Sequence, residues 1–120
     1  MIALDNGDKI QGDTTTASKV DYAIHGVVGT TITQLADGQL ASSKGDLYTS
    51  TADATVVASI SVVNTNTSTE KVNLYLLPSG GTARQLIPDD TRLEAGSLLL
   101  FDGRRLQIID SSGGTKVTEI

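Results

Sequence analysis

Residues 59–102 alternate short apolar segments with polar turns, and this pattern constrains the fold more than any other feature of the chain. Within TVVASISVVN and EKVNLYLL, side chains two positions apart share a face, which is the period of a β-strand. The polar run TNTST separates the two segments, and a proline and two glycines follow the second. Since these residues favour turns, the sequence predicts two strands that pair as a hairpin near the centre of a sheet.

The same alternation predicts which side chains of a strand face the core. Near residue 20, Val20, Tyr22 and Ile24 share one face, whereas Asp21 and His25 lie on the polar face. In TVVASISVVN, the alternation places Val56, Ala58, Ile60 and Val62 on one face and Val57, Ser59, Ser61 and Val63 on the other.

Turn residues predict where the other strands end. Asp-Gly at positions 102–103, between SLLLF and RRLQII, indicates a two-residue hairpin because both residues accept positive φ at low cost. A short strand is expected at residues 83–87, before Pro88. Weaker strands are expected near residues 9–11, 30–35 and 47–50, with turns at Asp37-Gly38 and Lys44-Gly45-Asp46.

The spacing of these segments indicates the fold class. Strand-like segments recur about every eight to twelve residues, and no segment shows a sustained helical period with a cap. The chain has 120 residues, enough for one domain, and its low aromatic content of 3% requires a core of Val, Ile, Leu and Ala. We expect an all-β fold, a single antiparallel β-sandwich with jelly-roll-like or immunoglobulin-like topology, over residues 1–110. Residues 111–120 are expected to form a Gly-rich C-terminal arm or a final strand docked on a neighbour.

Composition argues against several classes of partner. The net charge of −5 disfavours nucleic acid and anionic membrane surfaces, whose binding depends on Lys and Arg. No cysteine is present, so disulfides, thiolate nucleophiles and Cys-ligated zinc are excluded. The N-terminus lacks the pattern of a signal peptide, and no apolar run approaches the length of a membrane-spanning helix. We therefore expect a soluble chain made in the cytoplasm.

Residues that could support chemistry are few. His25 is the only histidine, and Asp21, on the same strand, would lie roughly 13 Å away. The acidic residues near the N-terminus and the pair Asp89-Asp90 lack the spacing of a calcium loop. No phosphate-binding glycine loop or nucleophile elbow is present. The sequence predicts no catalytic, cofactor-binding or metal site, and His25 is expected at the surface or an interface.

Arginine is concentrated in the last third of the chain, whereas the first third is acidic. A solvated face is the simpler explanation of this pattern. Arginine also forms bidentate pairs with carboxylates and is enriched at protein interfaces. The interface hypothesis predicts that this basic edge meets an acidic edge of a neighbouring copy or a host protein. The possible interface residues are Arg84, Arg92, Arg104, Arg105 and His25.

The segment SISVVNTNTSTEKVNLYLLPSGGTARQLIP resembles a segment common in small structural proteins of tailed bacteriophages. In those proteins a strand ending in V-N-T precedes a Ser/Thr turn, a V-x-L-Y-x strand and a Gly-rich loop. Residues 28–57, VGTTITQLADGQLASSKGDLYTSTADATVV, resemble the lead-in to that segment. In the relatives, however, a G-D-x-I-x-G-D block and a V-D-Y-x-I-x-G block end the chain, whereas here they begin it at residues 7–13 and 20–26. This difference resembles a circular permutation and predicts that the first hairpin lies beside the strands of residues 98–109, either in the same chain or, by strand exchange, in a neighbouring copy.

The resemblance implies a non-enzymatic protein of a tailed-phage virion, assembled in the host cytoplasm. A capsid decoration or cementing protein is the leading expectation, with capsid or other virion proteins as partners and a homo-oligomeric state. The alternative is a tail, baseplate or fibre module that binds a host-surface glycan or receptor, although few aromatic side chains are available for it. An enzyme that uses His25 as its base is the remaining alternative.

Overall fold

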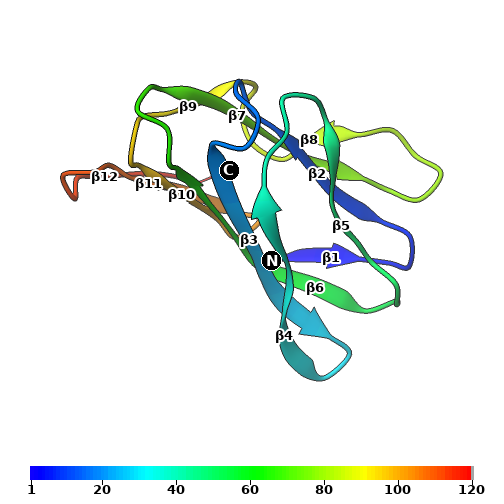
Figure 1. The fold of residues 1–120 in the computed structure, drawn as a ribbon. Coiled ribbons are helices and arrows are strands. Elements are labelled where there is room, and N and C mark those ends of the chain that lie inside the picture. Colours follow the sequence, from blue (N-terminus) through cyan, green and yellow to red (C-terminus); the bar gives the residue numbers. More distant parts are fainter. Residues whose placement is uncertain (120) are drawn as a thin grey trace.

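Two antiparallel β-sheets pack face to face in the computed structural model, which describes residues 1–119 (Figure 1). The expected single β-sandwich is therefore confirmed. The larger sheet has the order β12 (Thr115–Glu119), β11 (Arg105–Ile109), β10 (Leu98–Phe101), β6 (Thr55–Asn64), β3 (Val20–Val28) and β4 (Thr31–Gln39), and β1 (Ile2–Leu4) also pairs with β6. The smaller sheet has the order β5 (Gly45–Thr49), β2 (Lys9–Asp13), β7 (Glu70–Leu77) and β8 (Arg84–Gln85), and β9 (Thr91–Leu93) also pairs with β7.

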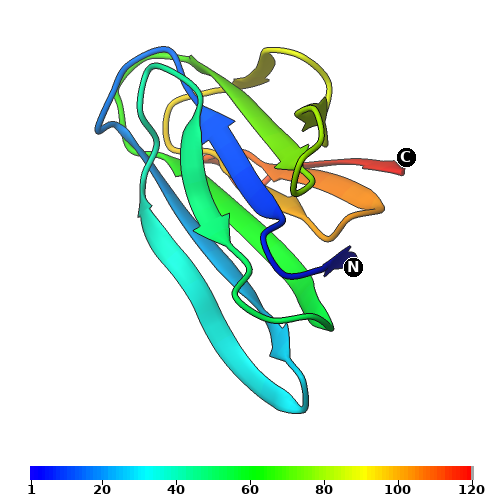
Figure 2. The same ribbon diagram turned by 90° about the vertical axis from the view of Figure 1, so that its right-hand side faces the viewer.

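A two-stranded ribbon folded across both sheets forms the centre of the molecule. Strand β2 pairs with β7 in the smaller sheet, and β3 pairs with β6 in the larger sheet. The chain thus runs through β2 and β3 and returns antiparallel through β6 and β7 (Figures 1 and 2). We call this arrangement the folded ribbon. Jelly-roll folds are built from ribbons rolled in this way, so the jelly-roll-like alternative describes the topology better.

The expected hairpin between β6 and β7 is wrong. The TNTST segment does not reverse the chain within one sheet but carries it from the larger sheet to the smaller one. Alternation identifies each strand correctly but does not identify its partner. Here the partners come from the N-terminal part of the chain.

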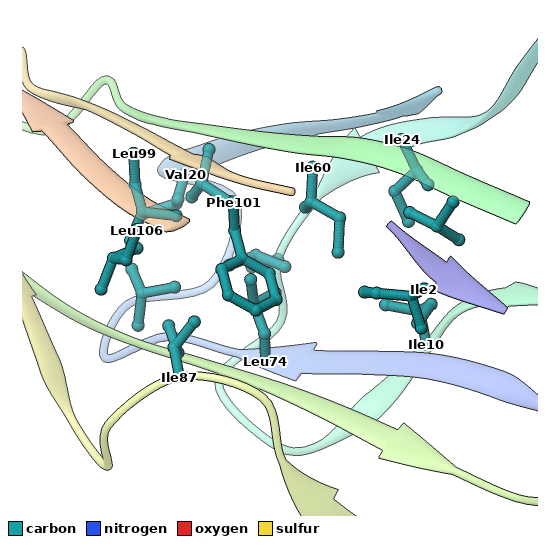
Figure 3. Close-up of a cluster of buried hydrophobic side chains, with 14 of the residues drawn as sticks. Ile2, Ile10, Val20, Ile24, Ile60, Leu74, Ile87, Leu99, Phe101 and Leu106 are labelled. Atoms are coloured by element: carbon teal, nitrogen blue, oxygen red, sulfur yellow. The ribbon is translucent and has the colours of Figure 1, made fainter. Parts of the chain in front are cut away.

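Aliphatic side chains from both sheets fill the interior (Figure 3). Val20 and Ile24 are buried as the alternation predicted, and Phe101, the only phenylalanine, lies among them. The labelled members of this cluster are Ile2, Ile10, Val20, Ile24, Ile60, Leu74, Ile87, Leu99, Phe101 and Leu106.

The alternation expected along the whole of β6 holds in its second half and fails in its first half. Val57, and not Val56, is buried together with Ile60 and Val62. The register against β3 shifts between His25 and Gly26, so one residue of β6 has no partner and the alternation changes phase. A β-bulge of this kind leaves no clear signal in the pattern of apolar residues.

The predicted hairpin forms between β10 and β11, but its two central residues lie one position later than predicted. The register places Gly103 and Arg104 at the centre of the turn, and Gly103 has a φ of 92°. Asp102 instead holds the turn, because its Oδ1 accepts bonds from the backbone N–H groups of Arg104 and Arg105. The expected turns at Asp37-Gly38 and Gly45-Asp46 are wrong, since these residues lie within β4 and β5.

Both ends of the described chain join the larger sheet. The tail forms β12, which pairs with β11 of the same chain rather than with a neighbour. The two N-terminal blocks do not form the expected hairpin, because β2 and β3 belong to different sheets. Strand β6 lies between β3 and β10, so the expected position beside residues 98–109 is wrong within one chain, whereas pairing by strand exchange with a neighbouring copy stays a prediction. Within residues 1–119, no helix long and apolar enough to cross a membrane is found.

Candidate functional site

The predicted interface residues are all exposed but do not form one edge. Arg104 and Arg105 are neighbours at the β10–β11 turn, whereas Arg84 lies on β8 of the smaller sheet. Arg92 on β9 lines a hollow together with Ile108 and Asp110, at the opposite end of β11 from the two arginines of the turn. The structure therefore brings together only Arg104 and Arg105.

His25 is exposed on the outer face of the larger sheet, at the bulge in β3. Its cross-strand neighbours are Gln34 on β4 and Ser59 on β6. Within residues 1–119, no hydrogen bond joins its imidazole to a carboxylate or a hydroxyl group. A general base needs such a positioned partner, or a substrate in reach, before it can act.

One surface hollow has a volume of about 490 Å³ and is lined in part by Arg92, Glu94 and Asp110. The carboxylate of Asp110 is occupied by its own turn, where it accepts bonds from Ser112 and from the backbone N–H of Gly114. These bonds, that of Ser112 first, hold the pKa of Asp110 below its usual value. His25 does not line this hollow. In the part of the chain that the structure describes, no three acidic or histidine side chains are grouped so that they could hold a metal ion.

A polar network covers the outer face of the smaller sheet around Tyr75. The Tyr75 hydroxyl donates to Asp13 Oδ2 at 2.8 Å, and Asn73 Nδ2 donates to Asp13 and to Asp90, each at 2.9 Å. Burial raises the pKa of Tyr75 to about 12, with further increases from the bond to Asp13 and from the nearby charges of Asp89 and Asp90. The phenol is therefore a fixed hydrogen-bond donor at neutral pH.

Lysine and glutamine side chains extend this polar face. The Lys44 ammonium lies 4.2 Å from the centre of the Tyr75 ring, a cation–π contact. Asp46 accepts bonds at 2.7 Å from Lys9 and from Gln11, and these two bonds, that of Lys9 first, lower its pKa. Gln11 is only 9% exposed, and its Oε1 has no partner within the described residues. Apart from that oxygen, the buried polar side-chain atoms of this face form hydrogen bonds with one another.

The outer face of the larger sheet has the opposite character. Across β6, β10 and β11, the register aligns Val63, Leu98 and Ile109 in one row, and Leu100 lies in the next row. These four side chains are half-buried and point away from the core, since their strand neighbours Val62, Leu99 and Ile108 pack against it. We call Val63, Leu98, Leu100 and Ile109 the apolar face. Beside it lies a shallow hollow of about 230 Å³, lined by Ser59, Leu100, Phe101, Asp102, Arg105 and Gln107.

Neither surface was identified from the sequence. The polar network joins residues that lie far apart in the chain, such as Asp13 and Tyr75, and no local pattern indicates their contact. The apolar face did have a signal, because SLLLF and TVVASISVVN carry aliphatic residues on both faces of their strands. A strand that is apolar on both faces indicates that both faces are covered.

Comparisons of the chain with protein-family models, with curated proteins and with solved structures found no match.

Proposed function

We propose that this chain is a non-enzymatic structural protein of a tailed-phage virion, and specifically a capsid decoration or cementing protein. The observation that carries the proposal is the resemblance of residues 59–88 to small structural proteins of tailed phages. In this chain, that segment provides the second half of β6, the crossing between the sheets, β7 and β8. The proposed partners are capsid or other virion proteins and further copies of the chain.

Several surface features suit contacts with proteins. The β3–β4 hairpin projects from the sandwich (Figure 2) and exposes Ile32, whose side chain is 86% accessible. The apolar face adds four aliphatic side chains on a sheet surface that no other described element covers. On a symmetric capsid, many weak contacts of this kind add up because each bound copy holds the next at high effective concentration.

Co-sedimentation tests the proposal directly. Purified protein is mixed with capsids of its phage that lack it, and bound protein is measured across a concentration series. We expect saturable binding, with a stoichiometry set by the capsid lattice and higher resistance of the loaded capsids to heat. Capsids that neither bind the protein nor gain heat resistance would contradict the decoration role.

The alternative, a tail or fibre module that binds a host glycan, is favoured by one observation. Tyr75 lies on the outer side of the smaller sheet among Asp13, Asn73 and Gln11, and glycan sites combine an aromatic ring with such groups, although Tyr75 itself is only 9% exposed. Lys44 already covers this ring, which weakens the alternative. Binding to host cells that is lost in the Tyr75→Ala protein, without binding to capsids, would support it.

A further inference from the structure

The outer side of the smaller sheet holds a buried oxygen atom that has no hydrogen-bond donor. Gln11 is only 9% exposed, and within residues 1–119 its Oε1 has no partner. The register places Gln11 between Asp46 on β5 and Tyr75 on β7, and its amide nitrogen donates to Asp46. The oxygen of the same amide is therefore left on the side of Tyr75. A buried acceptor without a donor is unfavourable, so this position suits a group that can donate.

The charged groups around this oxygen are mostly acidic. Four carboxylates belong to this side of the sheet, and they are those of Asp13, Asp46, Asp89 and Asp90. Two ammonium groups oppose them, that of Lys9, which pairs with one carboxylate, and that of Lys44. Lys71 lies four positions from Tyr75 along β7, roughly 13 Å away, and Arg84 belongs to the other face of β8, because its cross-strand neighbour packs against the core. The surface near Tyr75 therefore favours a cation.

The Tyr75 ring already attracts one cation from within the chain. The ammonium of Lys44 lies 4.2 Å from the ring centre, and Lys44 itself is exposed. Within the described residues, this ring contact is the sole interaction of that ammonium. A cation–π contact at an exposed site is weak, so the side chain can swing into solvent without a change in the backbone. A neutral ligand that displaced Lys44 would lose this contact, whereas a cationic ligand would replace it.

The acceptors around the ring do not fit a metal ion. In the part of the chain that the structure describes, no three acidic or histidine side chains are grouped so that they could hold one. Asp46 lies opposite Gln11 on the next strand, and Asp13 lies two positions from Gln11 along β2, roughly 7 Å away. A guanidinium is planar, stacks on aromatic rings and carries five N–H donors that can reach acceptors on different sides. The arrangement therefore suits arginine better than a metal ion or a compact ammonium.

We propose that the ring face of Tyr75 binds an arginine side chain of a partner protein, after Lys44 moves aside. The guanidinium stacks on the ring, donates to Gln11 Oε1 and pairs with the carboxylate of Asp46. That carboxylate can accept further bonds, because its side chain is 45% exposed and carries about four lone-pair positions, of which Lys9 and Gln11 use two. The inference goes beyond the proposed function, because it holds for any partner protein that presents an arginine.

Peptide titrations of the ¹⁵N-labelled full chain, followed by NMR, test this inference. The probe is acetyl-Gly-Arg-Gly-amide, and its control is the same peptide with citrulline, the uncharged analogue of arginine. At constant ionic strength, the arginine peptide should shift the side-chain amide signal of Gln11 and the backbone signal of Tyr75 saturably, with a dissociation constant of about 1 mM. The citrulline peptide should bind at least about fivefold more weakly, because it lacks the charge.

Removal of Lys44 is the sharpest test, since it should improve binding. Lys44→Ala removes the competing cation, so the dissociation constant of the arginine peptide should fall by about two- to fivefold. Lys19→Ala is the matched control, because it removes the same charge from an exposed position just before β3. Its dissociation constant should equal that of the wild type. A peptide attracted only by the net charge of the protein would respond equally to both substitutions.

Substitutions of the ring provide a second, independent comparison. Tyr75→Leu removes the stacking surface and should raise the dissociation constant by about fivefold or more. Tyr75→Phe keeps the ring and should bind within about twofold of the wild type. Circular dichroism checks the fold of each variant. If Tyr75→Leu does not fold, Gln11→Leu replaces it, and weaker binding is expected because the acceptor oxygen is lost.

Three results would overturn the inference. One is an unshifted Gln11 signal at about 20 mM arginine peptide in both the wild type and Lys44→Ala. Another is a Lys44→Ala protein that binds the peptide no more tightly than Lys19→Ala. The third is a shift of the Gln11 signal by an oligosaccharide such as maltoheptaose but not by the arginine peptide, which would assign the site to a glycan. Capsid co-sedimentation is measured separately, so a protein that binds capsids but no arginine peptide would leave the proposed function standing.

Discussion

At the scale of single residues, Glu70 shows how the two sheets are held together. Its carboxylate is 1% exposed and accepts bonds from Thr14 Oγ1, from the backbone N–H of Thr16 and from Asn66 Nδ2, at 3.0, 2.8 and 3.2 Å. Thr14 and Thr16 lie between β2 and β3, and Asn66 lies between β6 and β7. One side chain therefore joins both crossings of the folded ribbon.

The protonation of Glu70 should consequently control acid stability. Burial raises its pKa, but the bonds from Thr16, Asn66 and Thr14 together outweigh burial and hold the pKa below 4.5. Because the folded-state pKa is lowered, Glu70 stabilises the fold above about pH 4.5, and this contribution is lost as the pH falls through the folded-state pKa. At pH 7, Glu70→Gln should lower the free energy of unfolding by about 1 to 3 kcal/mol.

Thermal unfolding between about pH 3 and pH 7 measures this effect. The curves of the wild type and of Glu70→Gln should converge at the acid end. Glu94→Gln is the control, because it removes an exposed carboxylate from the turn before β10 and should leave the curve close to that of the wild type. Parallel curves for the wild type and Glu70→Gln would show that Glu70 is not the titrating group.

Tyr75 should ionise only at high pH, and its ionisation should lower the stability of the fold in alkali. Its pKa is raised to about 12, so its contribution to stability is present below about pH 10 and is lost as the pH rises through about 12. A tyrosinate absorbance titration should contain a component near pH 12 that is missing in Tyr75→Phe. Asp13→Asn should move that component toward pH 10, because it removes the bonded carboxylate. An unshifted component in Asp13→Asn would contradict this account.

At the scale of elements, the sequence predicts the positions of the strands better than it predicts which strands pair with one another. Alternation located β3, β6 and β7, and Gly103 located the β10–β11 hairpin, because these signals are local. The sequence predicts a hairpin at TNTST, where the chain in fact crosses between the sheets, because a polar turn has the same composition whether the chain reverses or changes sheet. The turn predicted at Asp37-Gly38 failed because Gly38 lies in β4 opposite Tyr22, whose ring packs closely over it.

Gly26 is the glycine on which the bulge of β3 depends. A Cβ atom at this position would lie 1.9 Å from the Val56 carbonyl oxygen, so the backbone of β3 or β6 would have to move. Gly26→Ala should therefore cost about 3 kcal/mol or more, as measured by denaturant unfolding. In Gly45→Ala, the added Cβ would have its nearest neighbour at 3.8 Å, and the change should stay within about 0.5 kcal/mol. Equal costs for the two substitutions would contradict the proposed role of Gly26.

At the scale of the whole molecule, the fold class followed from composition and spacing, but the surfaces did not. Residue type alone indicates the candidate interface residues, and of these only Arg104 and Arg105 lie together in the structure. The network of Asp13 and Tyr75 depends on the pairing of β2 with β7, which the sequence did not reveal. Long-range pairing therefore accounts for most of what sequence analysis missed.

The described core also predicts how much of the chain is needed to fold. Its buried members all lie between Ile2 and Leu106, whereas β12 adds a final strand beside β11. A protein that ends at Asp110 should therefore keep its circular dichroism spectrum and unfold cooperatively, with a lower melting temperature. Loss of cooperative unfolding in this truncated protein would make β12 part of the folding unit.

The folded ribbon also has a consequence for the order in which the chain folds. Its strand pairs are nested, from Val28 with Thr55 at the inner end to Lys9 with Leu77 at the outer end. Each outer pair closes a longer loop than the pair before it, so we expect pairing to start at the inner end and to spread outward. Glu70 can gain its partners only once both strands have crossed between the sheets. Joining the two layers is thus expected to be a late and slow event, after the larger sheet has begun to form.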